Sequence, residues 1–131
     1  MSERYALLLI DHGSRRAEAN TLIERVAEMI RERIASDRIV EHAHMELAEP
    51  TIDRGFAKCV ERGATVVVAH PFMLAPGRHV REDVPRLLAE AAANHPGTKY
   101  LLSDPLGAHP AIADIVLDRF EGALAGDEAK E

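Results

Sequence analysis

The chain has 131 residues, the usual size of one domain with a single hydrophobic core. Its composition, 47% hydrophobic and 29% charged with only 8 Gly and 7 Pro, excludes a disordered or fibrous protein. Sixteen Lys and Arg against 22 Asp and Glu give a formal charge of −6, which argues against broad nucleic-acid binding because such binding needs a basic surface.

The first part of the chain predicts a strand, a polar motif and a helix. Residues 5–10 form an apolar run of strand length that is too short to span a membrane. The motif Asp-His-Gly-Ser-Arg follows at positions 11–15. Residues 16–35 then place apolar side chains at helical spacing with charged residues between them, which predicts an amphipathic helix.

The middle of the chain repeats the pattern of a strand followed by a helix. Residues 39–46 have strand length and a rough period of two. A helix is expected to open at Pro50 and to stop at Gly63, since proline suits a first turn. Residues 65–69 are continuously apolar and β-branched, as in a central parallel strand that is covered on both faces.

The last part predicts a helix, a strand and a final helix. After a loop at residues 71–77, residues 80–93 have helical spacing, and residues 99–103 follow as the fourth strand. Residues 110–124 predict the last helix, and the polar residues 125–131 are expected to form a flexible tail. In that last helix we expect an apolar side to face the core, made of Ile112, Ile115, Val116 and Phe120.

Four repeats of strand and helix predict one α/β domain over residues 1–124. The pattern favours a flavodoxin-like three-layer α/β/α sandwich around a four-stranded, mostly parallel sheet in the order 2-1-3-4. Strands one and three are then neighbours, and the crevice opens between their carboxyl ends. The segments that follow these two strands, residues 11–15 and 70–79, would therefore face one another.

Both of these segments carry histidine, a residue type that binds metal through its imidazole. His12 follows the first strand, and His70 and His79 lie in the segment that follows the third. Imidazoles that converge on one crevice from separate strands can bind a metal ion together. The single Cys59 excludes an intrachain disulfide and a metal cluster held by thiolates of this chain alone. We expect no membrane segment, and the cytoplasm is the default compartment.

Five motifs together resemble the small sirohydrochlorin chelatases, which are class II tetrapyrrole chelatases. The motifs occupy residues 11–15, 44–52, 71–79, 83–85 and 105–110, and the similarity covers roughly residues 5–120. Their order and spacing make the resemblance specific. It implies a lyase that inserts a divalent metal into sirohydrochlorin on the way to sirohaem or cobalamin.

The resemblance also implies roles for individual residues. His12 and His79 correspond to the family's metal-binding histidines, and Glu46 is the best candidate for the carboxylate that helps to remove the pyrrole protons. The metal is expected as a co-substrate, Co²⁺ or Fe²⁺, with Ni²⁺ as an in vitro substitute and no organic cofactor. The predicted substrate-binding residues are Ser14, Arg15, Met73, Leu74, Arg78 and Arg81.

Several residues keep a structural alternative. Glu46 could instead cap the helix that follows it, and His109 could cap the last helix. His70 could line the cleft, or it could be a buried imidazole that is hydrogen-bonded to a backbone carbonyl. His42 and His44 alternate on one strand face and fit either substrate binding or a sheet edge.

The sequence leaves three classes of function and the choice of metal open. Besides the chelatase, a non-catalytic metal or tetrapyrrole carrier would need the same ligands. A phosphate-handling enzyme using Gly13 and Ser14 ranks third, because its supporting glycine-rich motifs are absent from the sequence. Two imidazoles do not encode which divalent ion is delivered, although the motifs resemble the ferrochelatase branch slightly more. Because one small unit offers half of the cleft that larger two-domain relatives build, a C₂ homodimer is predicted.

Overall fold

The computed structural model describes residues 2–130, with side chains for residues 2–127. The chain alternates strands and helices throughout, so the predicted order of elements is confirmed. The elements are β1 (Tyr5–Asp11), α1 (Ala17–Arg31), β2 (Ile39–His44), α2 (Ile52–Glu61), β3 (Val66–Pro71), α3 (Arg78–Ala93), β4 (Lys99–Leu102) and α4 (Pro110–Lys130).

The four strands form one parallel sheet in the order β2-β1-β3-β4, as the sequence predicts. Leu8 of β1 stands in register with Glu41 of β2 and Ala69 of β3. The two central strands carry nearly continuous apolar runs because both of their faces are covered over most of their length. All carboxyl ends consequently lie at one edge of the sheet.

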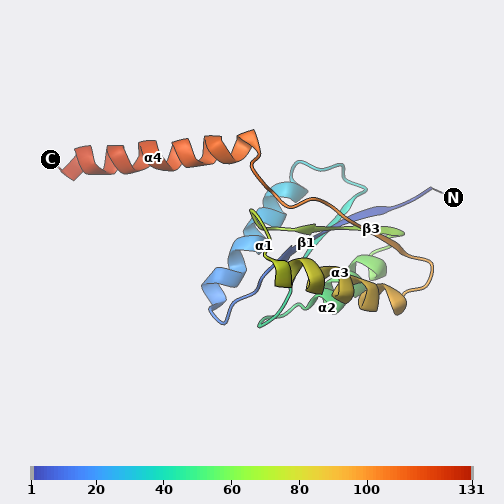
Figure 1. Cartoon of the computed structure of the whole chain (residues 1–131). Coiled ribbons are helices and arrows are strands. Elements are labelled where there is room, and N and C mark those ends of the chain that lie inside the picture. The colour runs from blue at the N-terminus through green and yellow to red at the C-terminus, as the bar shows by residue number, and fades with distance from the viewer. Residues whose placement is uncertain (1, 131) are drawn as a thin grey trace.

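Helices cover both faces of this sheet, which confirms the three-layer architecture (Figure 1). On one face α2 and α3 enclose the larger core, which includes Leu8, Phe56 and Leu88 at no measurable exposure. On the other face α1 packs Ile23 and Ala27 over the β2 side of the sheet. The side chain of Glu41 is also buried, where Lys58 of α2 and Arg62, the C-cap residue of that helix, neutralise it.

Helix α4 lies apart from the three layers and projects away from the domain (Figure 1). The prediction that its apolar side faces the core is wrong for Ile115, Val116 and Phe120, which are 50%, 60% and 55% exposed, whereas Ile112 is half-buried. The physical reason is that α4 leaves the domain at the carboxyl edge of the sheet (Figure 1), so most of its apolar side chains within the described residues are exposed. The helix also includes residues 125–130 of the predicted tail, whereas Glu131 lies outside the described residues.

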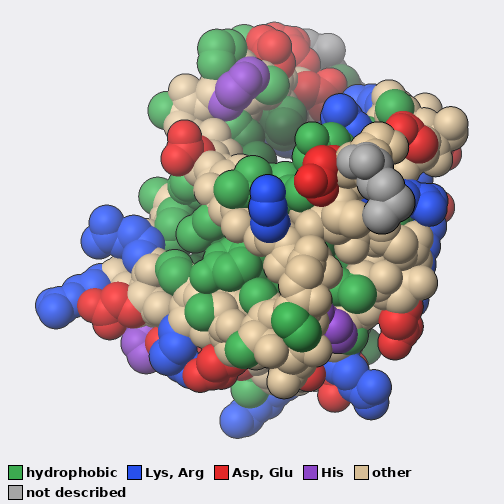
Figure 2. Space-filling model, turned by 90° about the vertical axis from the view of Figure 1, so that its right-hand side faces the viewer, with side chains coloured by type: hydrophobic (Ala, Val, Ile, Leu, Met, Phe, Trp, Pro, Cys, Tyr) green, Lys and Arg blue, Asp and Glu red, His purple; other side chains and the backbone are tan. Residues whose placement is uncertain are grey.

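The departure of α4 leaves part of the sheet uncovered on the α1 side. Leu101 of β4 is 58% exposed and Tyr5 of β1 is 42% exposed. Figure 2 shows hydrophobic side chains gathered in a continuous group on one side of the domain, with Lys and Arg at its border. Among the described residues, no helix is both long and apolar enough to cross a membrane.

Candidate functional site

The carboxyl ends of β1 and β2 hold His12 and Glu46 beside one another. Hydrogen bonding between the two chain segments continues past the strands, because Met45 N donates to Asp11 O (2.9 Å) and Glu46 N donates to His12 O (3.2 Å). The Nδ1 atom of His12 lies 3.6 Å from Oε1 of Glu46, and the two side chains are 55% and 50% exposed. An imidazole and a carboxylate thus share a water-accessible position at the edge of the sheet.

Gly13 allows this close approach. Its φ of +93° is rarely adopted by residues with a side chain, and a Cβ added there would lie 1.8 Å from the backbone oxygen of Glu46. The same Cβ would lie 3.3 Å from the Cβ of His44. The loop after β1 can therefore pack against the loop after β2 only with glycine at this position.

A buried pair supports the site from below. His44 is 1% exposed, and its Nδ1 atom lies 2.6 Å from Oδ1 of Asp11, its partner in the register between β1 and β2. Buried polar groups are normally hydrogen-bonded, so this contact fixes the side chain of Asp11, which immediately precedes His12. His44 lies on β2, an edge strand of the sheet, and its side chain is a buried supporting residue, a role that the sequence did not suggest.

Glu46 does not cap a helix. The N-cap of α2 is Thr51, whose side chain accepts a hydrogen bond from Arg54 N at 3.2 Å. The Glu46 carboxylate is therefore left facing His12, which rules out the structural alternative for this residue.

Ser14 and Arg15 lie in the turn between the site and α1. Ser14 Oγ accepts a hydrogen bond from Arg16 N (3.0 Å), while Asn20 receives one from Ser14 N (2.9 Å) and donates one to Ser14 O (2.7 Å). The Ser14 hydroxyl thus helps to order this turn, and Arg15 is exposed. Sequence reasoning missed Asn20, although asparagine is a poor helix former and its place in the first turns of a helix was an available signal.

His79 lies in the first turn of α3, after the loop that follows β3. Its side chain is 82% exposed, and its Nε2 atom lies 2.9 Å from Oδ2 of Asp83, one turn further along the helix. Asp83 also pairs with Arg86 at 3.3 Å. Sequence reasoning gave Asp83 no role, although its spacing of four residues from His79 predicts the contact.

The structure does not unite the predicted ligands in one cluster. His12 pairs with Glu46, and His79 pairs with Asp83. Within residues 2–127, no group of three or more His, Cys, Asp or Glu side chains has the geometry of a metal site. The exposed pairs are an open arrangement, unlike a closed four-ligand structural site.

The loop after β3 separates the two predicted apolar substrate contacts. Met73 is partly buried and packs on the larger core, whereas Leu74 is 57% exposed. Both backbone carbonyls accept hydrogen bonds of 2.9 Å, from Leu106 N and Gly107 N of the loop that leads to α4. Only Leu74 of the two therefore presents its side chain to solvent.

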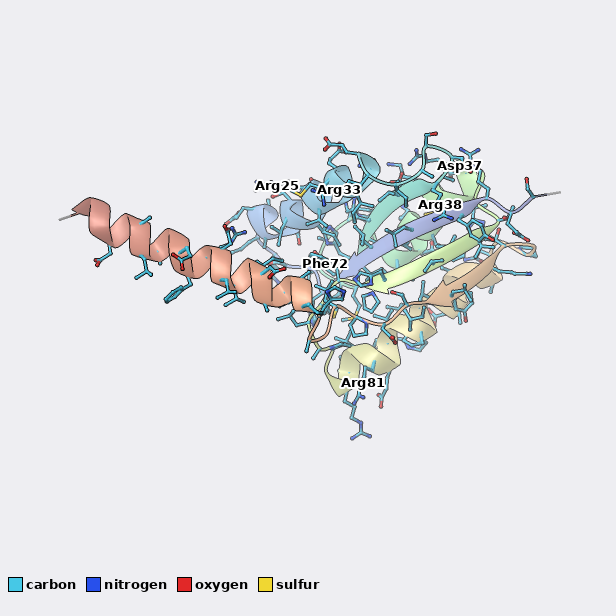
Figure 3. The ribbon with its side chains drawn as sticks, turned by 90° about the horizontal axis from the view of Figure 1, so that it is seen from above. Arg25, Arg33, Asp37, Arg38, Phe72 and Arg81 are labelled. Carbon is cyan, nitrogen blue, oxygen red and sulfur yellow. The ribbon has the colours of Figure 1, made fainter. Side chains whose placement is uncertain are left out.

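The two predicted substrate-binding arginines on α3 are exposed to solvent. Arg78 lies 3.3 Å from Glu82 and is 88% exposed. Arg81 extends away from the end of α3 that lies nearest to α4 (Figure 3). Solvated guanidinium groups of this kind can form charge-assisted hydrogen bonds with an incoming carboxylate.

An apolar groove of about 540 Å³ lies where α4 meets the domain. Phe72 marks this junction in Figure 3. Within the groove His70 contacts Ser103 Oγ at 2.9 Å, and burial lowers the pKa of the His70 imidazole, an effect that a hydrogen bond to the Asp104 backbone opposes. The lining residues are Val26, His70, Phe72, Pro105, Leu106, His109, Ala111, Ile112 and Ile115.

The remaining histidines lie outside the His12 pair. His109 caps α4, because its Nδ1 atom accepts a hydrogen bond from Ala111 N at 3.0 Å. His42 lies beside Glu24 at 3.6 Å, and burial lowers the pKa of its imidazole. His95 stacks on Phe56 with 5.7 Å between ring centroids.

Comparisons with known proteins agree with this fold. The CbiX family model matches residues 6–123. The chain is 46% identical to the chloroplastic sirohydrochlorin ferrochelatase of Arabidopsis thaliana over 91% of its own length, but spans only 52% of that relative. It is 33% identical to the sirohydrochlorin cobaltochelatase of Methanopyrus kandleri, over 94% of this chain and 99% of the relative.

A solved structure of double size is also similar. The sirohydrochlorin chelatase SirB from Bacillus subtilis subspecies spizizenii, in complex with cobalt, superposes with a TM-score of 0.82 at 29% identity. That match covers 91% of this chain and 50% of SirB. Because the family model covers most of its length and full-length relatives share a third of its residues, the chain belongs to the CbiX family.

Proposed function

We propose that the protein is a sirohydrochlorin chelatase, a lyase that inserts Co²⁺ or Fe²⁺ into the macrocycle. The observation that carries the proposal is the exposed pair of His12 and Glu46, which Gly13 and the buried contact between Asp11 and His44 hold at the carboxyl edge of the sheet. Family membership and the names of the relatives support the substrate.

The chemistry requires a site that binds the metal weakly enough to release it. The divalent ion is a substrate, and His12 and His79 are the proposed ligands, with water completing the coordination. Insertion expels two pyrrole protons. Glu46 is proposed to accept these protons and pass them to water, since its carboxylate is exposed beside the imidazole.

Binding of the macrocycle is proposed to rely on charge and on a local apolar contact. Sirohydrochlorin carries many carboxylates around an apolar ring. Arg15, in the loop after His12, and Arg78 and Arg81, on α3 beside His79, supply exposed positive charge. Leu74 offers the exposed apolar contact, whereas Met73 supports the loop from the core. Ser14 is proposed to shape the turn that carries Arg15.

Assembly and location complete the proposal. A homodimer would bring two copies of this half-length unit together, and its length relative to SirB supports that state. The cytoplasm is the proposed compartment, which cell fractionation tests directly.

Turnover distinguishes the chelatase from a carrier. Anaerobic protein is mixed with a large molar excess of sirohydrochlorin and Co²⁺ or Fe²⁺, and metallation is followed by absorption. A chelatase converts many equivalents of macrocycle faster than buffer does. A single equivalent bound without faster metallation would identify a carrier and refute the proposed reaction.

A further inference from the structure

The two proposed metal ligands differ in how their rings are held. The Nε2 atom of His79 lies 2.9 Å from Oδ2 of Asp83, which is hydrogen-bonding distance. The Nδ1 atom of His12 lies 3.6 Å from Oε1 of Glu46, which is too long for a hydrogen bond. Of these two imidazoles, only that of His79 is therefore hydrogen-bonded to its neighbouring carboxylate.

Asp83 is itself held from its other side. Its Oδ1 atom lies 3.3 Å from Nη2 of Arg86, and Nη1 of Arg86 lies 3.2 Å from Oε1 of Glu90. These residues follow His79 along α3 at helical spacing, so they share one side of the helix. Because Asp83 uses a different oxygen for each partner, its contact with Arg86 leaves Oδ2 facing His79.

The larger core fixes the backbone beneath this contact. Val80 and Val84, which directly follow His79 and Asp83 in the chain, are 7% and 2% exposed in that core. The Asp83 side chain is 23% exposed, whereas the His79 side chain is 82% exposed. Asp83 is short and held on two sides, so the carboxylate sets the orientation of the imidazole rather than the reverse.

The same contact determines which ring nitrogen carries the proton. An ionised carboxylate can only accept hydrogen bonds, so the Nε2 atom of His79 must be the N–H donor. In a neutral imidazole the lone pair is then on Nδ1, and a metal ion binds through that lone pair. We propose that Asp83 is a positioning residue, which fixes this tautomer so that His79 offers Nδ1 to the metal substrate.

This inference rests on the proposed function, because it takes the divalent ion as substrate and His79 as one of its ligands. An imidazole whose orientation is fixed binds a cation more tightly, since it loses less freedom on binding and the carboxylate increases the electron density on the ring. Loss of Asp83 should therefore weaken the binding of the metal without changing the binding of the macrocycle.

A purely structural role for Asp83 gives a different expectation. Oppositely charged residues four positions apart also occur as simple helix-stabilising pairs. The pair of Arg78 and Glu82, 3.3 Å apart on the same helix, provides the comparison. Glu82→Ala and Asp83→Ala each remove one negative charge and one such pair from α3, but of the two carboxylates only that of Asp83 contacts His79.

Nitrogen NMR of the histidine rings tests the tautomer and the ligand atom. Long-range proton–nitrogen spectra of protein labelled with ¹⁵N-histidine are recorded without metal and with Zn²⁺, a diamagnetic divalent probe, and His79 is assigned by the signals that His79→Gln lacks. In wild type we expect Nε2 to carry the proton in both spectra and Nδ1 to shift when Zn²⁺ is added. In metal-free Asp83→Ala we expect both tautomers. Zn²⁺ bound through Nε2, no change at His79, or a variant identical to wild type would each overturn the inference.

Metal affinity and kinetics test the consequence for the site. Competition with a chromophoric chelator should show Co²⁺ binding weakened about 10-fold or more in Asp83→Ala. In the metallation assay the Co²⁺ concentration for half-maximal rate should rise by a similar factor, while the KM for sirohydrochlorin stays at the wild-type value. Asp83→Glu, which keeps the carboxylate, should recover most of the affinity. Glu82→Ala is the matched control and should bind Co²⁺ as wild type does. Equal losses in Asp83→Ala and Glu82→Ala would refute a specific role for the contact with His79.

These outcomes separate the role of Asp83 from the proposed reaction. Accelerated metallation by a wild type that binds metal through Nε2 of His79 would overturn the role of Asp83 and leave the chelatase standing. A wild type that does not accelerate metallation would refute the reaction, and the Zn²⁺ spectra would still decide whether Asp83 directs His79 to bind through Nδ1.

Discussion

Gly13→Ala perturbs the candidate site at the point where its two loops touch. The added Cβ would lie 1.8 Å from the backbone oxygen of Glu46, and real contacts of this kind stay beyond 3.0 Å. The two loops must therefore separate by about 1.2 Å, which moves Glu46 away from His12. A displacement of about 1 Å costs on the order of 100-fold in rate, and the left-handed φ costs a further roughly 1–2 kcal/mol of stability.

The assay is the initial rate of sirohydrochlorin metallation, measured beside urea unfolding of the same variant. We expect a rate about 100-fold below wild type in protein that still folds. Gly77→Ala is the matched control, because its φ is −71° and no atom lies within 4 Å of the added Cβ. A Gly13→Ala enzyme that keeps the wild-type rate would refute the argument that close loop packing sets the geometry of the site.

Three further predictions concern the stability and reactivity of buried groups. His44→Phe removes the contact to Asp11 and should lower the free energy of unfolding by about 1–3 kcal/mol, measured in urea; unchanged stability would show that the pair supports nothing. Burial holds the pKa of His42 and His70 below the ordinary 6.5, so the unfolded chain binds protons before the folded chain does as the pH falls. The free energy of unfolding should therefore be constant above this range and decline as the pH drops below 6.5, and His70→Gln should make the decline smaller. A free energy of unfolding that does not change with pH would contradict this. Burial raises the pKa of Cys59 to about 12, so iodoacetamide should label it only after unfolding, and rapid labelling of native protein would disagree.

The sequence was sufficient to predict the sheet and its order. Residues 65–69 form an almost continuous apolar run rich in β-branched residues, which is typical of a central parallel strand. The alternation of strand and helix then leaves few topologies, because parallel crossovers are right-handed. The neighbouring carboxyl ends of β1 and β2, and hence the meeting of His12 with Glu46, follow from that order.

The position of α4 could not be predicted in the same way. The apolar spacing of Val116 and Phe120 specifies that one side of the helix needs a partner, but not which surface provides it. A helix that packs on its own sheet and one that packs on another copy carry the same pattern. Periodicity therefore predicted the helix correctly and its contacts wrongly.

The supporting residues of the site were the other gap. The contact of His44 with Asp11 depends on a register between strands 33 residues apart in sequence, which no local pattern encodes. The need for glycine at position 13 likewise arises from the backbone of Glu46, a contact across two loops. Functional side chains can be recognised in a sequence by their residue type, whereas the residues that position them can be identified only once the pairing of the strands is known.

The most direct measurement of the central claim compares metallation rates of three histidine variants. His12→Ala and His79→Ala remove the two proposed ligands, and His95→Ala removes an imidazole that stacks on Phe56 outside the His12 and His79 pairs. With Co²⁺ and sirohydrochlorin under anaerobic conditions, we predict that the first two variants lose about 100-fold or more in rate while the third matches wild type. Wild-type rates for His12→Ala and His79→Ala would contradict the claim that these side chains deliver the metal.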